Sequence, residues 1–115
     1  MNAETPIPFP LASRLPEEIF FDRKELGQIL RIYGRMVAAG EWRDYAISSL
    51  RDLAVFSVFR RTAEVPLYRI EKCPRLRNRQ GLYAVVGQDG RVLRRGQDLD
   101  QVLKFFDQRR FGIVE

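Results

Sequence analysis

Histidine is absent from this chain of 115 residues, and cysteine occurs once, at Cys73. Without histidine there is no imidazole general base, no Ser-His-Asp triad and no Cys/His zinc site. A single cysteine forms no disulfide within the chain. These two absences remove the commonest hydrolytic and metal chemistries. We therefore expect a protein that is not an enzyme, with no catalytic residue, no metal and no cofactor.

Long hydrophobic runs are also missing. No window of the sequence approaches the ~18 consecutive apolar residues that cross a bilayer. The first residues lack the basic and apolar regions of a secretory signal. We therefore expect a cytoplasmic protein without a membrane partner. The hydrophobic fraction of 45% is ordinary for a folded domain of this length.

Proline is concentrated near the start, at Pro6, Pro8, Pro10 and Pro16. Because proline removes backbone donors and disfavours helix at the preceding residue, residues 1–18 are predicted to form an extended tail. Residues 19–115 are predicted to form a single α+β domain.

A first helix is predicted within residues 21–40. Asp22 is a good N-cap and Glu25 follows three residues later, which is the spacing of a capping box. Gly27 and Gly34 lie inside this helix, seven residues apart and hence on one side. Two explanations stand for them: close packing within the monomer, which we favour, or a face that meets a second copy. A second helix is predicted to begin after Asp98.

Between the helices the sequence predicts strands. Residues 45–50 alternate well enough for a strand, although a helix also fits, and Trp42 before them is expected to be a packing anchor. Residues 53–59 are apolar on both faces and are predicted to be a strand covered on two sides. Residues 67–72, 82–86 and 91–95 follow, the last two joined at Asp89-Gly90 by a predicted type I′ turn. The prediction is an antiparallel meander of four or five strands packed against two amphipathic helices.

The positive charge is confined to one segment. Residues 1–59 carry seven Lys/Arg and eight Asp/Glu, residues 60–95 carry ten and three, and residues 96–115 carry three and four. The ten basic residues are Arg60, Arg61, Arg69, Lys72, Arg75, Arg77, Arg79, Arg91, Arg94 and Arg95. If the loop 74–81 is extended, Arg75, Arg77 and Arg79 project to one side. The alternative is that these residues only keep sheet edges and turns soluble.

Several runs resemble one family of proteins. They are RMVAAGEWRDYA (35–46), AVFSVFRR (54–61), PLYRIEK (66–72) and RQGLY (79–83). They are similar to a family of small alphaproteobacterial proteins filed as domain of unknown function 2794. The resemblance implies a stand-alone bacterial cytoplasmic protein, and it implies no activity, ligand or catalytic residue.

The residues themselves favour a small binding protein. Arginines interleaved with aromatic residues are typical of surfaces that hold phosphates and stack on bases, so nucleic acid is the first expected partner. The ten basic residues are then expected to gather on one outward surface. The alternative is an adaptor or regulatory protein that binds an acidic protein partner, as a monomer or a homodimer, to which the Gly27 and Gly34 face contributes.

Overall fold

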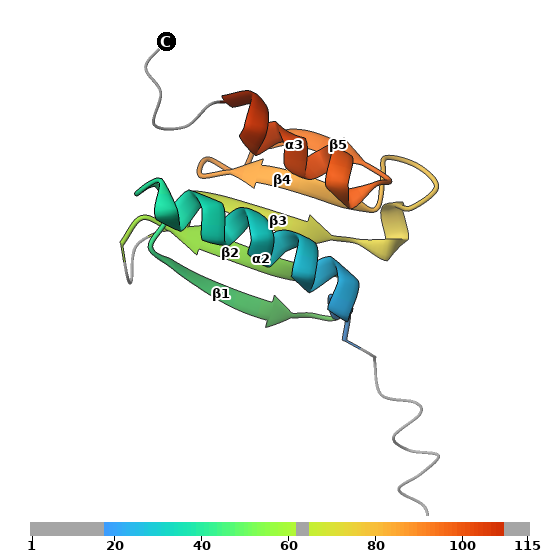
Figure 1. The fold of residues 1–115 in the computed structure, drawn as a ribbon. Coiled ribbons are helices and arrows are strands. Elements are labelled where there is room, and N and C mark those ends of the chain that lie inside the picture. The colour runs from blue at the N-terminus through green and yellow to red at the C-terminus, as the bar shows by residue number, and fades with distance from the viewer. Residues whose placement is uncertain (1–17, 62–64, 110–115) are drawn as a thin grey trace, which may run out of the picture.

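The structure is a computed structural model, and it describes residues 18–61 and 65–109 (Figure 1). Its elements are α2 (Arg23–Ala38), β1 (Asp44–Ser49), β2 (Ala54–Phe59), β3 (Tyr68–Lys72), the 3-10 helix η1 (Pro74–Leu76), β4 (Tyr83–Gly87), β5 (Val92–Gly96) and α3 (Leu99–Arg109). The predicted α+β class is confirmed. The predicted proline-rich tail lies outside the described residues except for Glu18. Within the described ranges, no helix has the length and apolar character to cross a membrane.

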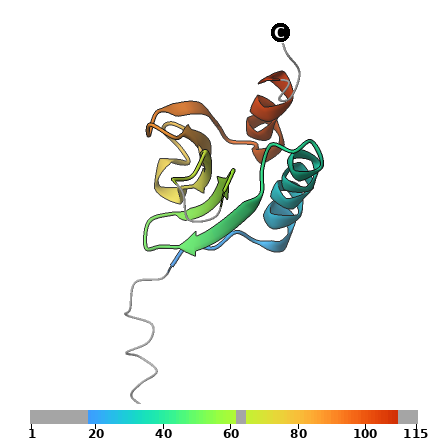
Figure 2. The ribbon, with the colours of Figure 1, turned by 90° about the vertical axis from the view of Figure 1, so that its left-hand side faces the viewer.

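The five strands form one sheet in the order β1-β2-β3-β4-β5, and every neighbouring pair is antiparallel. This is the predicted meander. Both helices lie on the same face of the sheet, with α3 in front of β4 and β5 and α2 beside it, as the two views show (Figures 1 and 2). No helix of the described part of the chain covers the opposite face, which we call the open face.

The start of α2 is fixed by the predicted capping box. The Asp22 carboxylate accepts a hydrogen bond from the Glu25 backbone N–H at 2.8 Å, and the Glu25 carboxylate accepts one from the Asp22 N–H at 2.7 Å. Asp98 caps α3 similarly, accepting from the N–H groups of Asp100 at 3.0 Å and Gln101 at 3.4 Å. Both caps satisfy N–H groups that a helix start otherwise leaves without partners.

The core lies between the helices and one face of the sheet. Phe56 is fully buried there, and its cross-strand neighbour Ile70 is also inaccessible. Trp42, 3% exposed, packs edge-on against Phe106 of α3 with ring centroids 5.0 Å apart. The expectation that Trp42 is a packing anchor is confirmed. Rings of this kind each bury on the order of 200 Å², so they dominate the apolar area of a small core.

The prediction that helices or strands cover β2 on two sides is wrong. Its second face belongs to the open face, yet Val55 there is only 7% exposed. In the sheet register Val55 lies opposite Glu71 of β3. Longer side chains on the neighbouring strand can shield a valine at this position without a second layer. An apolar run therefore does not by itself indicate cover on both faces.

The hairpin of β4 and β5 differs from the predicted two-residue turn. The Gly87 N–H donates to the Arg91 carbonyl at 2.8 Å, so three residues separate the closing pair. Gly90, with φ of 89°, takes the left-handed conformation in this loop. The register then shifts between Val85 and Val86, which is the mark of a bulge. Asp89-Gly90 correctly predicted the position of the turn, but the loop is one residue longer than predicted.

Candidate functional site

The ten basic residues do not gather on one surface. Cross-strand partners in an antiparallel sheet point to the same face, and successive residues of a strand point to opposite faces. Arg94 lies opposite Val85, whose side chain is in the core, so Arg94 is on the helix side. Arg95 lies opposite Ala84 and is therefore on the open face, together with Arg69 of β3. The sheet thus divides the basic residues between its two faces and its two ends.

Lys72 is part of a buried polar cluster on the helix side. Its ammonium group lies 2.8 Å from the carboxylate of Glu25, and the two side chains are 15% and 8% exposed. It also donates to the Phe20 carbonyl at 2.9 Å. The Tyr83 hydroxyl donates to the other oxygen of Glu25. Lys72 is thus placed as a structural residue, away from the open face.

The arginine loop is not extended. Residues 74–76 form η1, and turn hydrogen bonds from the Arg79 and Gly81 N–H groups to the Leu76 carbonyl close the rest of the loop. Pro74 favours this compact shape because its fixed φ suits the first position of a helix. Arg75, Arg77 and Arg79 therefore do not project to one side as predicted. Arg77 lies close enough to Tyr83 to lower the pKa of that hydroxyl slightly, against the larger effects that raise it.

Arg69 and Arg95 lie on the open face, and Arg75 and Arg79 belong to the loop that Arg95 contacts. We call these four residues the arginine surface. Arg69 pairs with Glu71 on the same face, with Nε 3.2 Å from the carboxylate oxygen. Arg95 donates to the Gly81 carbonyl at 3.4 Å, which joins the open face to the arginine loop.

Arg75 and Arg79 line a hollow of about 490 Å³ together with Cys73 and Leu76. Cys73 follows directly after Lys72, so extended backbone turns its side chain away from the helices. The pairing of Arg75 with Asp52 is loose, at 3.7 Å between exposed groups. A surface pair of this kind contributes little, on the order of 0–1 kcal/mol, so Arg75 is available to an anionic ligand at small cost.

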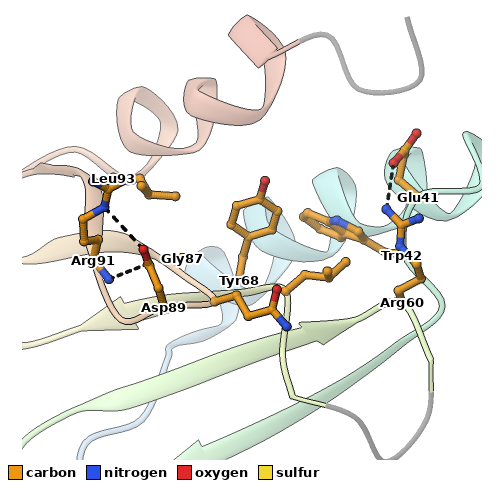
Figure 3. Close-up of a pocket in the computed structure, with 10 residues that line it drawn as sticks. Glu41, Trp42, Arg60, Tyr68, Gly87, Asp89, Arg91 and Leu93 are labelled. Atoms are coloured by element: carbon orange, nitrogen blue, oxygen red, sulfur yellow. Dashed lines mark hydrogen bonds and ion pairs between the residues drawn. The ribbon is translucent and has the colours of Figure 1, made fainter. Parts of the chain in front are cut away.

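The opposite end of the sheet, where β4 ends at Gly87, holds a separate pocket of about 500 Å³ (Figure 3). Tyr68 and Trp42 stand in its middle, and Arg60 and Arg91 lie on its two sides. Each arginine already has a carboxylate beside it, since Arg60 lies 3.7 Å from Glu41 and Arg91 lies 3.5 Å from Asp89. Arg61 follows Arg60 at this end and is exposed.

This pocket combines aromatic and apolar walls with two cations, which is a pattern that suits a flat group with an anionic substituent. Gly87 and Leu93 line it side by side, and a Cβ on Gly87 would lie 3.1 Å from the Leu93 side chain, so there is little room for a larger residue at Gly87. No local sequence pattern indicates this pocket, since its lining comes from four separate segments, 41–42, 60, 67–68 and 87–93. Two carboxylates match the two arginines of this pocket, whereas the four arginines of the arginine surface also have only two, so the pocket attracts an anion more weakly.

Gly27 and Gly34 contradict the packing explanation that the sequence favoured. A Cβ placed on either residue would meet nothing within 4 Å, and both residues are exposed. They therefore make no close approach to the sheet or to α3. Packing of α2 within the monomer therefore does not require glycine at these two positions.

The acids of the described residues are not grouped as a metal site. No group of three or more Cys, Asp or Glu side chains within the described ranges is arranged to hold a metal ion. The most buried acid, Glu25, is occupied by its cap, by Lys72 and by Tyr83.

Comparisons with known proteins place the chain in a family. No match was found among curated proteins or among solved structures. A family model described as "Protein of unknown function (DUF2794)" matches residues 19–103. The match begins just before the cap of α2 and ends within α3, so it spans the sheet and the two helices. The chain belongs to the DUF2794 family of proteins of unknown function.

Proposed function

We propose that this protein binds nucleic acid through the arginine surface, mainly by contacts to phosphates. The observation that carries the proposal is the open face itself. Two helices cover one side of the sheet and leave the other without a helix, and Arg69 and Arg95 lie on that uncovered side. Guanidinium groups bind phosphates with two parallel donors, which makes arginine well suited to this contact.

The distribution of acids supports the same face. The two helices and their caps carry five of the eleven carboxylates of the described residues, namely Asp22, Glu25, Asp98, Asp100 and Asp107. On the strands β3 to β5, the open face carries one acid, Glu71, between Arg69 and Arg95. A polyanion approaching the open face therefore meets an excess of positive charge, because the four arginines of the arginine surface are paired with only two carboxylates, Glu71 and Asp52.

The shape of the face also suits a backbone ligand. Its middle positions are small or short, with Ser57 next to Arg69 and Ala84 next to Arg95 in the register. Ala84 is only 1% exposed, so a nucleic-acid backbone meets the long arginine side chains of this face rather than the sheet itself. Because few aromatic side chains stand on this face, base stacking contributes little and sequence preference is expected to be weak.

A polarisation titration with generic DNA and RNA at several salt concentrations tests the proposal. If four phosphates are neutralised on a duplex, log K falls with log salt at a slope of about −3 to −4. The double variant Arg75→Glu with Arg79→Glu is expected to lose most of the affinity and of the slope. An absence of binding at low salt would overturn the proposal.

A matched control separates a specific surface from net charge. Arg31 of α2 and Lys104 of α3 are exposed on the helix layer. The double variant Arg31→Glu with Lys104→Glu changes the net charge by the same amount as the loop variant. It is expected to keep most of the affinity. Equal loss in both variants would mean that only net charge matters, which contradicts the assignment of the site.

An acidic protein would meet the same arginines, and it is the competing partner class. A protein partner shows no uniform dependence on phosphate number and is not displaced by generic DNA or RNA. Capture of the protein on immobilised nucleic acid, released by salt and reduced by the loop variant, favours the proposed function over the adaptor alternative.

A further inference from the structure

The first strand of the sheet has an edge with no neighbour among the described strands. β1 pairs with β2 on one side only. The hydrogen bond from the Leu50 N–H to the Leu53 carbonyl, 2.9 Å, fixes which residues bond to β2. Because bonded positions alternate in an antiparallel pair, the backbone groups of Tyr45, Ile47 and Ser49 point away from β2. The Tyr45 N–H accordingly donates to the carboxylate of its neighbour Asp44, at 2.8 Å.

This edge lacks the features that protect exposed strands. Natural edge strands are commonly guarded by lysine, proline, bulges or inward charges. β1, with the sequence DYAISS, carries one charge and no proline. The other edge strand, β5, carries Arg94 and Arg95, has a shifted register against β4, and is followed by α3, which packs on it. Among the strands that the structure describes, β1 is therefore the one whose edge is open to pairing with another strand.

Exposed apolar side chains gather along the same edge. The described chain exposes eight large hydrophobic residues, and six of them belong to α2, β1 or the segments joined to β1: Phe20, Leu30, Val37, Tyr45, Ile47 and Leu50. The rings of Tyr33 and Tyr45, with centroids 4.9 Å apart, connect the helix to the strand. The Ile19 N–H donates to the Leu50 carbonyl at 2.8 Å, which brings the Phe20 segment to the end of β1. We call these six residues the β1 patch.

We propose that β1 pairs with β1 of a second copy of this chain, so that the two sheets join across a two-fold axis and the β1 patches cover each other. The axis passes through Ile47. In this register Ile47 lies opposite Ile47 of the second copy, and Tyr45 lies opposite its Ser49. All outward backbone groups of the three residues then find partners at once.

Charge and area both favour a second copy as the occupant. With Ile47 on the axis, Asp44 lies opposite Leu50 of the other copy, so the one charge of β1 does not meet itself. The six exposed fractions, between 40% and 62%, correspond to on the order of 500 Å² of apolar surface. A standard interface buries ~800 Å² on each partner, of which roughly 60% is apolar, so the patch supplies about the apolar area needed.

The two-fold axis stands perpendicular to the sheet, because paired residues of an antiparallel ladder share a face. Both open faces then lie on the same side of one continuous sheet. The dimer is inferred without reference to the proposed function, and either can fail alone.

Sedimentation and light scattering test the state of the chain. The expected mass is twice the 13.5 kDa of one chain. Ile47→Lys is expected to shift the protein to the monomer, because it places two like charges on the axis. Val92→Lys is the matched control, since Val92 is 49% exposed on the other edge strand and Ile47 is 45% exposed. This control is expected to stay dimeric. A wild-type chain that is monomeric at high concentration overturns the proposal.

Cross-linking tests the register. Residues opposite each other in a hydrogen-bonded antiparallel pair have Cα atoms about 5.5 Å apart, which matches the spacing of a disulfide. Ile47→Cys in a Cys73→Ser background is expected to form a covalent dimer on mild oxidation, with the folded circular dichroism spectrum retained. Val92→Cys in the same background is expected to stay monomeric on a denaturing gel. A folded Ile47→Cys protein that gives no cross-link, or equal cross-linking in both, contradicts the arrangement.

Discussion

Tyr83 of β4 donates its hydroxyl hydrogen to the carboxylate of Glu25, the residue that completes the cap of α2. The ammonium group of Lys72 binds the other side of this carboxylate, so one acid joins a helix start to two neighbouring strands. Glu25 is 6% exposed, and a buried charge is tolerated only when its partners are supplied. This cluster explains why Lys72, a candidate for ligand binding by sequence, is a structural residue.

This cluster makes the free energy of unfolding depend on pH in the alkaline range. Burial, followed by the hydrogen bond to Glu25, raises the pKa of Tyr83 above its ordinary value of 10.0. Below pH 10 both the folded and the unfolded chain keep the proton. Above it the unfolded chain releases a proton that the folded chain retains, so the free energy of unfolding falls as pH rises.

The slope from this one group reaches at most about 1.4 kcal/mol per pH unit. Denaturant titrations of the wild type and of Tyr83→Phe, repeated between neutral pH and the alkaline range, measure it. The wild type is expected to lose more stability than the variant as pH rises through 10. Tyr33, whose pKa burial also raises, is present in both proteins and cancels in the difference. Parallel curves would contradict the effect.

Lys72 and Arg69 both belong to β3, on opposite faces of the sheet, and have different expected roles. Lys72→Ala leaves the buried Glu25 carboxylate without its cation, so we expect a loss of about 2–4 kcal/mol in the free energy of unfolding. Arg69→Ala removes a partly exposed pair on the open face and is expected to cost less than about 1 kcal/mol.

The two variants are expected to reverse their order in nucleic-acid affinity. Under conditions in which both are folded, Arg69→Ala weakens binding and Lys72→Ala leaves it near the wild-type value. Chemical denaturation and polarisation titrations on the same preparations provide both measurements. A Lys72→Ala protein that is stable but does not bind would move Lys72 back into the ligand site.

Glycine substitutions are expected to separate positions with room from positions without it. Gly27→Ala and Gly34→Ala are each expected to raise the stability of the folded chain by about 1 kcal/mol, because alanine favours the helix and the added Cβ meets nothing within 4 Å. Gly81→Ala is expected to be destabilising, since Gly81 has φ of 120° and its added Cβ would lie 3.0 Å from the Gly96 backbone. Thermal unfolding of the three variants compares them directly, and a loss of stability in the helical variants would contradict the open space around them.

The local features of the fold were readable from sequence, whereas the layering was not. Asp22 and Glu25 mark the helix start by spacing alone, and the alternation of residues 45–50 indicated a strand correctly. The side of the sheet taken by each helix depends on contacts such as that of Trp42 with Phe106, which link distant segments. No local sequence pattern encodes which face of the sheet a helix covers. The apolar residues on both faces of the 53–59 segment indicated cover on two sides, whereas both described helices lie on one.

The candidate site was predictable in composition but not in arrangement. Ten basic residues in one segment directed the prediction to the strands and turns of residues 60–95. Their distribution depends on the face of the sheet to which each strand residue points. It also depends on η1, which makes the arginine loop compact instead of extended. Sequence reasoning missed the pocket around Tyr68 and Trp42 altogether, because its lining residues are adjacent only after folding.

The strands lie in the sheet in the same order as in the sequence, and this has a consequence for the rate of folding. Each of the four ladders joins segments that follow one another in the chain, so no strand waits for a distant partner to arrive. Loop closure costs little over such short separations, and topologies built from neighbouring hairpins reach the native state faster than those with long crossovers. During synthesis on the ribosome the sheet can therefore grow by one strand at a time. The helix α3, which follows β5 in the chain, then completes the core.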